Sequence, residues 1–285
     1  MADLLLNNAG AEVFVPDGTD IDQALERTTL MGIGAHQDDL EIMAYHGIIT
    51  CFGSGDEWFT GVVMTNGSGS PRDKLYADYT DEQMQEVRRR EQKKAAVVGE
   101  YSAVAMLDYP SSAIKDPKED AAVEDLKALL LAAKPRGIYT HNLADKHDTH
   151  GGIALRLIQA LRELLPQYKP EKLYGCEVWK SLDWMCDDRK VVLPVDKHEN
   201  LAAALLGIFD SQIAGGKRYD LATMGRRRAN ATFMASHAVD VSEGTTVAMD
   251  LMPLLDDISR DPFEIVREQI DLFANEVKQR LEKLS

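Results

Sequence analysis

A short polar turn between an apolar strand and a helix constrains the fold more than any other feature of the sequence. Residues 28–35 are a near-continuous apolar run, and a helical pattern begins at Leu40. A strand that is apolar along its length suits a sheet covered on both faces. The turn between them carries His36, Asp38 and Asp39. Because open α/β sheets bind ligands beyond the carboxyl ends of their strands, we expect a ligand site here.

Strands and helices alternate through the first half of the chain. Further strands are expected at residues 58–65, 102–107 and 137–140, and helices at residues 40–52, 80–98, 120–133 and 151–165. Thr80 and Gln83 have the spacing of a capping box at the start of one of these helices. Alternation of this kind is typical of βαβ units. We therefore predict a Rossmann-like three-layer α/β/α fold with a mostly parallel sheet.

The pattern is less regular after about residue 172. Strands are expected at residues 173–179, 190–195, 237–241 and 246–250, and helices at residues 197–209, 219–234 and 263–284. The last helix has a clear apolar face. No repeat, low-complexity tract or linker divides the sequence. Residues 1–285 are therefore interpreted as one domain, in which the part from about residue 172 forms the substrate pocket and the edges of the sheet.

Charge and cysteine content limit the partners. The 285 residues include 47 acidic and 32 basic side chains, which give a formal net charge of −15. A surface this negative repels phosphate backbones, so no nucleic acid is expected as a partner. The three cysteines are too scattered for a disulfide framework, and neither a signal peptide nor a membrane span is indicated. We expect a cytoplasmic protein that binds a small molecule. Whether it forms a homo-oligomer through the C-terminal helix is left open by the sequence.

A second set of metal-capable side chains follows the strand expected at residues 137–140. His147 and His150 lie three positions apart there, on the same edge of a parallel sheet as the first turn. A catalytic zinc site uses three protein ligands and leaves one position for water. One carboxylate of the pair Asp38 and Asp39 can bind the metal while the other acts as general base. The two histidines can likewise divide into a ligand and a proton donor.

Both segments resemble motifs of one family. The sequence His36-Gln37-Asp38-Asp39-Leu40-Glu41 resembles the AHPDDE-type signature of the LmbE-like or PIG-L family of zinc-dependent N-deacetylases. The sequence His147-Asp148-Thr149-His150 resembles the later His-Pro-Asp-His motif of that family. A weaker likeness extends to Thr65-Asn66-Gly67 and to the Arg88-x-x-Glu91 segment.

The resemblance implies roles for individual residues. His36, Asp39 and His150 are implied to hold the metal, which is Zn²⁺ or another divalent ion such as Fe²⁺. Asp38 is implied to be the general base, and His147 the acid that stabilises the oxyanion and protonates the leaving amine. The implied reaction is the hydrolytic removal of an acetyl group from an N-acetylated amino sugar or glycoside.

The sequence departs from the family pattern in three places. Gln37 replaces the usual proline, and the acidic residue of the signature is moved one place along, to Glu41. Thr149 stands where the family often has an aspartate that polarises the catalytic histidine. Asp148 or Asp145 is the available substitute for that aspartate.

Other interpretations use the same residues differently. An acidic pair at a helix start is often a cap that complements the helix dipole. Arg88 and Arg72 are expected to contact the substrate, although helical arginines are commonly solvated. His141 is a candidate either for a metal ligand or for a residue that supports the ligands, and the supporting role is favoured. The alternative functions are a non-catalytic Rossmann-like module for a nucleotide or sugar phosphate, and an amidase that acts on a larger conjugate.

Overall fold

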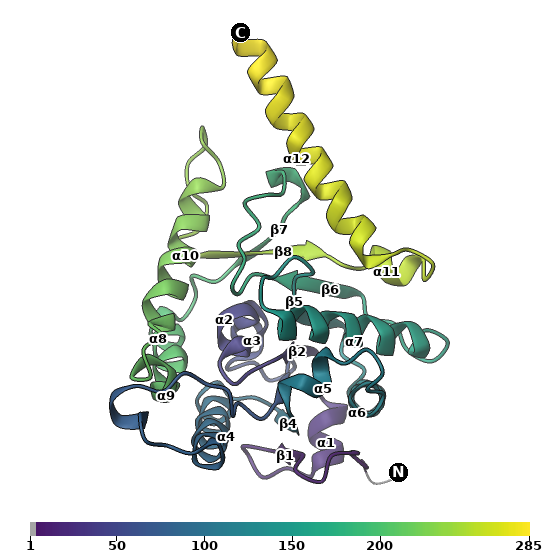
Figure 1. Cartoon of the computed structure of the whole chain (residues 1–285), viewed down its shortest axis with the longest axis vertical. Helices are drawn as coiled ribbons and strands as arrows, with labels where there is room; N and C mark the ends of the chain where they lie inside the picture. The colour runs from purple at the N-terminus through teal and green to yellow at the C-terminus, as the bar shows by residue number, and fades with distance from the viewer. Residues whose placement is uncertain (1–3) are drawn as a thin grey trace.

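An eight-stranded β-sheet runs through the structure, a computed structural model that describes residues 4–285 (Figure 1). Its strands are β1 (Glu12–Phe14), β2 (Leu30–Gly34), β3 (Phe59–Thr65), β4 (Ala103–Tyr109), β5 (Gly137–His141), β6 (Lys172–Cys176), β7 (Val191–Pro194) and β8 (Thr245–Asp250). They lie in the order β1-β4-β3-β2-β5-β6-β8-β7. The sheet therefore includes strands from both halves of the sequence.

The sheet is mixed, so the prediction of a mostly parallel sheet is wrong. The five strands from β4 to β6 pair in parallel. At the edges, β1 pairs with β4, β8 with β6, and β7 with β8, all in the antiparallel sense. The direction of an edge strand depends on the path of its connection, which an apolar run in the sequence does not record. The narrower description as Rossmann-like stays a prediction.

The strand order reverses at β2. From β2 the chain proceeds outward to β3 and β4, and it then returns to place β5 and β6 on the other side of β2. Ligands of open α/β sheets bind at such a reversal, where the loops after the two neighbouring strands separate. The loops that follow β2 and β5 therefore border the position at which a site is expected.

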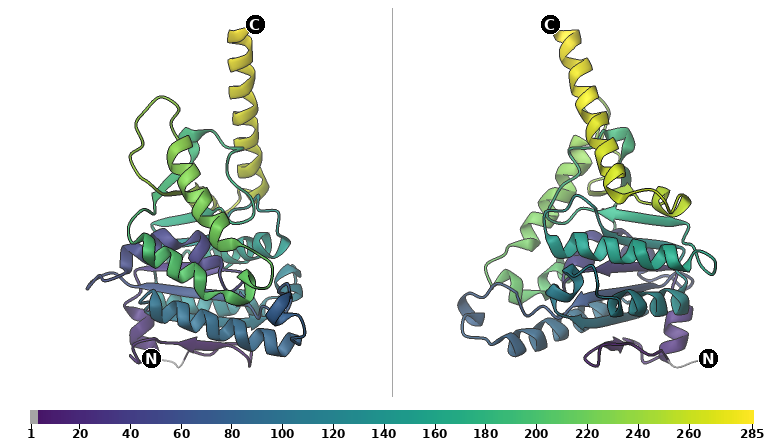
Figure 2. Two further views of the ribbon diagram at one scale, coloured as in Figure 1. Left: turned by 90° about the vertical axis from the view of Figure 1, so that its left-hand side faces the viewer. Right: turned by 45° about the vertical axis from the view of Figure 1, so that its right-hand side comes forward.

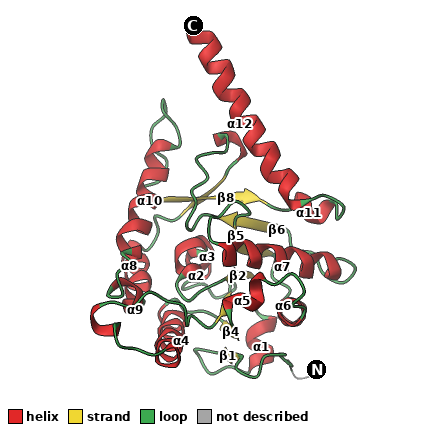
Figure 3. Ribbon diagram, in the orientation of Figure 1, coloured by secondary structure: helices red, strands yellow, loops and turns green. Residues whose placement is uncertain are grey.

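Helices cover both faces of the sheet (Figure 3). Their bounds are α1 (Ile21–Glu26), α2 (Asp39–Met43), α3 (Tyr45–Cys51), α4 (Asp81–Val98), α5 (Ser111–Lys115), α6 (Ala121–Ala133), α7 (Asp148–Leu164), α8 (Glu199–Ile208), α9 (Asp210–Ile213), α10 (Tyr219–Phe233), α11 (Pro253–Asp256) and α12 (Pro262–Leu284). Short 3₁₀ turns occupy Lys74–Tyr76 and Asp187–Arg189. None of the helices in the described part of the chain has the length and apolar character needed to cross a membrane.

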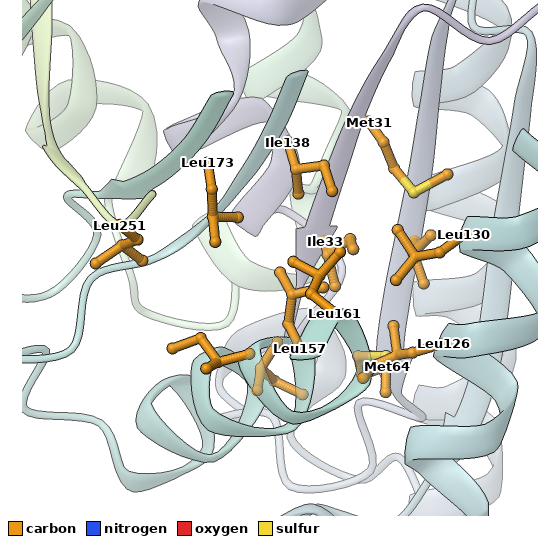
Figure 4. Close-up of a cluster of buried hydrophobic side chains, with 14 of the residues drawn as sticks. Met31, Ile33, Met64, Leu126, Leu130, Ile138, Leu157, Leu161, Leu173 and Leu251 are labelled. Carbon is orange, nitrogen blue, oxygen red and sulfur yellow. The ribbon is translucent and has the colours of Figure 1, made fainter. Parts of the chain in front are cut away.

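Two apolar clusters lie on opposite faces of the sheet. Met64 of β3 packs with Leu126 of α6 and Leu157 of α7 in the first cluster (Figure 4). Its neighbour Val63 belongs to the second cluster, with Leu40 of α2. Successive side chains of a strand point to opposite faces. This explains why β2, β3 and β5 are buried at every position rather than at alternate ones.

Most expected elements are present within a few residues of their predicted bounds. The capping box is confirmed: the Gln83 backbone N–H donates to Thr80 Oγ1 (3.3 Å), and the Thr80 N–H donates to Gln83 Oε1 (2.9 Å). The helix expected at 40–52 is divided at Ala44 into α2 and α3.

The strand expected at residues 237–241 is wrong. These residues lie in exposed turns, where Val239 and Val241 are 89% and 99% exposed. Alternating valines suggest a half-buried strand, but here they have no sheet on which to pack.

Candidate metal centre

Two loops at the carboxyl ends of neighbouring strands bring the predicted metal-binding residues together. His36 lies in the turn after β2, and Asp39 is the first residue of α2. His150 lies in the first turn of α7, which follows β5. The first turn is closed by two hydrogen bonds. The His36 backbone N–H donates to Asp39 Oδ2 (2.7 Å), and the Asp39 N–H donates to the His36 carbonyl oxygen (3.2 Å).

The three potential ligand atoms form a nearly equilateral triangle. Nδ1 of His36 lies 3.3 Å from Oδ2 of Asp39 and 3.3 Å from Nε2 of His150. The distance between that Nε2 and Oδ2 of Asp39 is 3.5 Å. A tetrahedral zinc ion with bonds of about 2.0–2.2 Å separates its ligands by about 3.4 Å. The donor types and their spacing therefore fit a divalent ion, and the cluster could hold one.

The charges around Asp39 favour a cation. Burial opposes ionisation of this carboxyl, but interactions with His150 and His141 outweigh it and hold the pKa of Asp39 well below its ordinary range. Burial also lowers the pKa of His150, but Asp39 and Asp145 outweigh that effect and raise it. Asp39 is therefore an ionised carboxylate that can bind a cation without first losing a proton.

Asp145 supports His150 from the side of the ring opposite the cluster. Its side chain is fully buried, and its Oδ2 lies 3.5 Å from Nδ1 of His150. The same oxygen accepts a hydrogen bond from the Trp179 backbone N–H (3.0 Å), and Oδ1 accepts one from the His147 N–H (3.0 Å). Metal-binding histidines commonly direct their second ring nitrogen to a carboxylate. The sequence suggests Asp145 as a partner of the His147 ring, whereas the structure places it against His150.

His141 lies beside the cluster, with its Nε2 3.4 Å from Oδ2 of Asp39. Its Nε2 accepts a hydrogen bond from the Ala35 backbone N–H (2.9 Å). The ring is fully buried and stacks on that of His150, with 3.8 Å between centroids. Burial lowers the pKa of His141 to about 4, so the ring is neutral near pH 7. These contacts favour the supporting role over the ligand role.

Asp38 lines a cavity next to the cluster. Its backbone φ is 108°, a conformation that costs a residue other than glycine about 1–3 kcal/mol. The buried side chain makes no helix-capping hydrogen bond, and its Oδ2 lies 3.6 Å from Nη2 of Arg88. Burial raises the pKa of Asp38 to about 8, with Arg88 opposing the rise and Asp39 adding to it. The interpretation of Asp38 as a helix cap therefore has no support.

His147 faces the same cavity from the start of α7. Its ring centroid lies 5.0 Å from that of His36 and 4.6 Å from that of His150. Burial lowers the pKa of His147, and the nearby His150 and His36 lower it further. Its Nδ1 is buried and has no hydrogen-bond partner in the described chain. The His147 ring therefore lacks the carboxylate partner that an aspartate at position 149 would supply, and Asp148 does not replace it because Asp148 is exposed to solvent.

The two arginines expected to contact substrate have different surroundings. Arg88 is buried, lines the cavity and donates a hydrogen bond to the Gln37 carbonyl oxygen. Arg72 donates to the Ser68 carbonyl oxygen (2.8 Å) and to Asp81 (2.5 Å) and does not itself line the cavity, although its neighbour Pro71 does. Contact of either arginine with substrate stays a prediction.

Glu41 has no contact with the cavity. Its buried carboxyl accepts hydrogen bonds from Nε2 of Gln92 (2.9 Å) and from the Tyr101 hydroxyl (2.8 Å). Burial raises the pKa of Glu41 to about 7, although both hydrogen bonds oppose the rise. The displaced acidic residue therefore ties α2 to α4 and is not placed to act on a ligand.

The cavity beside the cluster is open and has a volume of about 330 Å³. Beyond the metal cluster its wall includes the indole of Trp179, whose ring lies 5.9 Å from that of Tyr219 with the planes nearly perpendicular. Gln212 and Lys217 add polar groups. None of these four residues was predicted as a site residue, because the sequence does not indicate which side chains after residue 172 face the site.

Comparisons with known proteins identify the same part of the chain. Residues 31–168 match the family model described as PIG-L, GlcNAc-PI de-N-acetylase. None of the curated proteins compared with the sequence matches it.

Solved structures with a similar fold include enzymes of two reaction types, deacetylases and a hydratase. N,N′-diacetylchitobiose deacetylase from Pyrococcus horikoshii is 15% identical, with a TM-score of 0.57 over 80% of this chain and 85% of that chain. The zinc-inhibited form of teicoplanin deacetylase is 14% identical, with a TM-score of 0.56 over 79% and 98%. The 4-carboxy-2-hydroxymuconate hydratase from Pseudomonas putida is 16% identical, with a TM-score of 0.57 over 79% and 95%. At these identities the likeness is one of fold.

The family match begins in β2 and ends after α7, so it contains both motifs and both loops that form the cluster. The resemblance seen in the sequence is thereby confirmed, and residues 31–168 of this chain are a PIG-L (LmbE-like) domain.

Proposed function

We propose that the protein is a metal-dependent hydrolase that removes the acetyl group from an N-acetylated amino sugar or glycoside. The observation that carries the proposal is the triangle of His36, Asp39 and His150, with Asp38 and His147 facing the adjoining cavity. The deacetylases among the similar folds support this reaction class. The hydratase with the same fold shows that the fold alone does not determine the chemistry.

The metal ion is proposed to be held by His36, Asp39 and His150. When bound, a divalent ion such as Zn²⁺ or Fe²⁺ acts as a Lewis acid and makes a bound water more acidic. The ionised carboxylate of Asp39 supplies negative charge to the ion, and Asp145 fixes the orientation of the His150 ring.

Asp38 and His147 divide the proton transfers between them. Asp38 takes a proton from the attacking water, and a neighbouring cation lowers its raised pKa toward the range that a base requires near pH 7. His147 stabilises the charge that develops on the carbonyl oxygen and passes a proton to the departing nitrogen. The products are acetate and a free amine.

Trp179 and Tyr219 are proposed to hold the sugar. The indole lines the cavity beside His147, with 6.5 Å between the two ring centroids. An aromatic face of this kind packs against the apolar face of a sugar ring and leaves its hydroxyl groups to Gln212 and other polar residues of the wall. The acetamide then lies toward His36 and Asp38.

Acetate release from a panel of N-acetylglucosamine derivatives tests the proposal. Release is expected to stop after treatment with a chelator and to return when Zn²⁺ or Fe²⁺ is added. Acetate release that the chelator leaves unchanged overturns the metal-dependent mechanism. If larger amide conjugates are cleaved and acetylated sugars are not, the protein is the amidase of the alternative interpretation. Tight binding of a nucleotide or sugar phosphate without turnover indicates the non-catalytic module.

A further inference from the structure

The C-terminal part of α12 extends beyond the body of the protein (Figure 2), and Phe273, Glu276 and Arg280 on one side of the helix line a pocket with residues 183–190. Among its side chains, Ile265 and Val266 near its first turn are buried. Residues 267–284 then continue as helix for about 27 Å, at about 1.5 Å per residue. Helices in proteins gain most of their stability from packing of an apolar face. A helix that extends this far with an uncovered apolar face is therefore expected to have a partner.

The uncovered face has the spacing of a coiled-coil seam. Its residues are Ile270, Ala274, Val277, Leu281 and Leu284, which are separated by four, three, four and three positions. Ile270, Leu281 and Leu284 are 48%, 61% and 79% exposed. Several of these residues line a shallow groove along the helix. An alternation of three and four residues places apolar side chains along one stripe that a second helix covers.

We propose that α12 of a second copy of the chain packs against this seam in the antiparallel direction. Asp271 and Lys278 both flank the seam on the same side, one heptad apart. If Ala274 faces Val277 of the second copy, Asp271 lies on the same side of the seam as Lys278 of that copy and about 3 Å from it along the helix axis. Two-fold symmetry forms the same pair a second time. The seam is therefore complementary to itself in charge as well as in shape.

The surroundings of the two charges leave them free for this pairing. Asp271 has no ion-pair partner among residues 4–285, and Lys278 meets only Glu282, at 3.9 Å. In a parallel pair in register, each residue lies level with its own copy, so Asp271 and Lys278 do not meet.

Sedimentation of the full chain over the micromolar range tests the proposal. The unmodified protein is expected to sediment as a dimer. The Leu281→Lys variant is expected to sediment as a monomer, with half that mass. Gln279→Lys adds the same charge on the exposed opposite face of the helix and is expected to leave the dimer intact. Circular dichroism checks that both variants keep the same helix content. A monomer in the unmodified protein, or a dimer that survives Leu281→Lys, overturns the proposal.

Charge reversal tests the direction of the pairing. Asp271→Lys alone is expected to weaken the dimer at least several-fold, because it places two lysines beside each other on the same side of the seam. The double variant Asp271→Lys with Lys278→Asp restores the opposite charges and is expected to recover the dimer. Failure of the double variant to recover, while both variants remain helical, overturns the antiparallel arrangement.

Discussion

Oδ2 of Asp145 lies 3.5 Å from Nδ1 of His150, on the side of the ring that faces away from Asp39 and His36. A carboxylate in this position fixes which ring nitrogen is free to bind a metal. The same carboxylate accepts a hydrogen bond from the Trp179 backbone, so the proposed ligand His150 and the aromatic wall of the cavity are held by one side chain.

Asp145→Asn is expected to weaken metal binding by about 10–100-fold, because the ring of His150 loses its charged partner. Titration of the chelator-treated protein with Zn²⁺ measures this change directly, without a substrate. Asp148→Asn is the matched control, since Asp148 is exposed in the same segment. Equal affinity of the two variants for Zn²⁺ would show that the contact with His150 has no role in binding.

Asp38→Ala is expected to keep the metal and lose turnover by about 10²–10⁴-fold, the usual contribution of a positioned general base. Metal content and acetate release are measured on the same sample. Asp39→Ala is the comparison, because removal of a ligand is expected to lower metal content first. Loss of metal in Asp38→Ala, with metal retained in Asp39→Ala, means that the two carboxylates have exchanged roles.

Trp179→Ala is expected to raise KM for an acetylated sugar by about 3–10-fold, which corresponds to about 0.5–1.5 kcal/mol of lost packing against the ring. Trp179→Phe keeps an aromatic face and is expected to recover most of the affinity. The value of kcat is expected to change less than KM, since Trp179 does not touch the transferred proton. A reduction confined to kcat contradicts a binding role for the indole.

Glu41→Gln is expected to make the chelator-treated protein more stable than the unmodified protein, by an amount that grows as pH rises. Burial raises the pKa of Glu41 from 4.5 to about 7, so folding favours its protonated form. This contribution to the free energy of unfolding is complete below pH 4.5, falls as pH rises, and is lost above about pH 7. Glutamine keeps the uncharged shape at every pH, and its amide can donate to the unpaired Oε1 of Gln92.

The measurement is the difference in unfolding free energy between the two proteins across pH 4 to pH 8. That difference is expected to grow in favour of Glu41→Gln by up to about 3 kcal/mol between pH 4.5 and pH 7 and then to level off. A difference that is constant with pH shows that Glu41 is ionised in the folded protein.

The central strands and the two motifs could be predicted from the sequence because their causes are local. The apolar run before His36 predicts β2, since every one of its side chains is buried between two helical layers. The edge strands could not be assigned a direction, because their direction depends on long connections. The alternating valines Val239 and Val241 predict a strand, but both are exposed and have no neighbouring strand in the described chain to pair with.

The candidate site could be predicted only in part for a similar reason. The resemblance to the family motifs implies His36, Asp39 and His150, whereas residue types alone leave open which carboxylate and which later histidine bind the metal. The assignment of Asp145 to His150 rather than to His147 depends on a separation of a few ångströms between side chains. Trp179 and Tyr219 reach the cavity from segments far apart in the sequence from both motifs, so only the folded chain brings them to it.

The position of the cluster at the reversal of strand order has a consequence for folding. His36 and His150 are 114 positions apart in the sequence. An ion held by both would bind the folded chain and not the unfolded chain, in which these side chains are far apart on average, so it would stabilise the fold by mass action. Such an ion would link the first and middle thirds of the polypeptide, and its binding free energy would add to the free energy of unfolding of the domain.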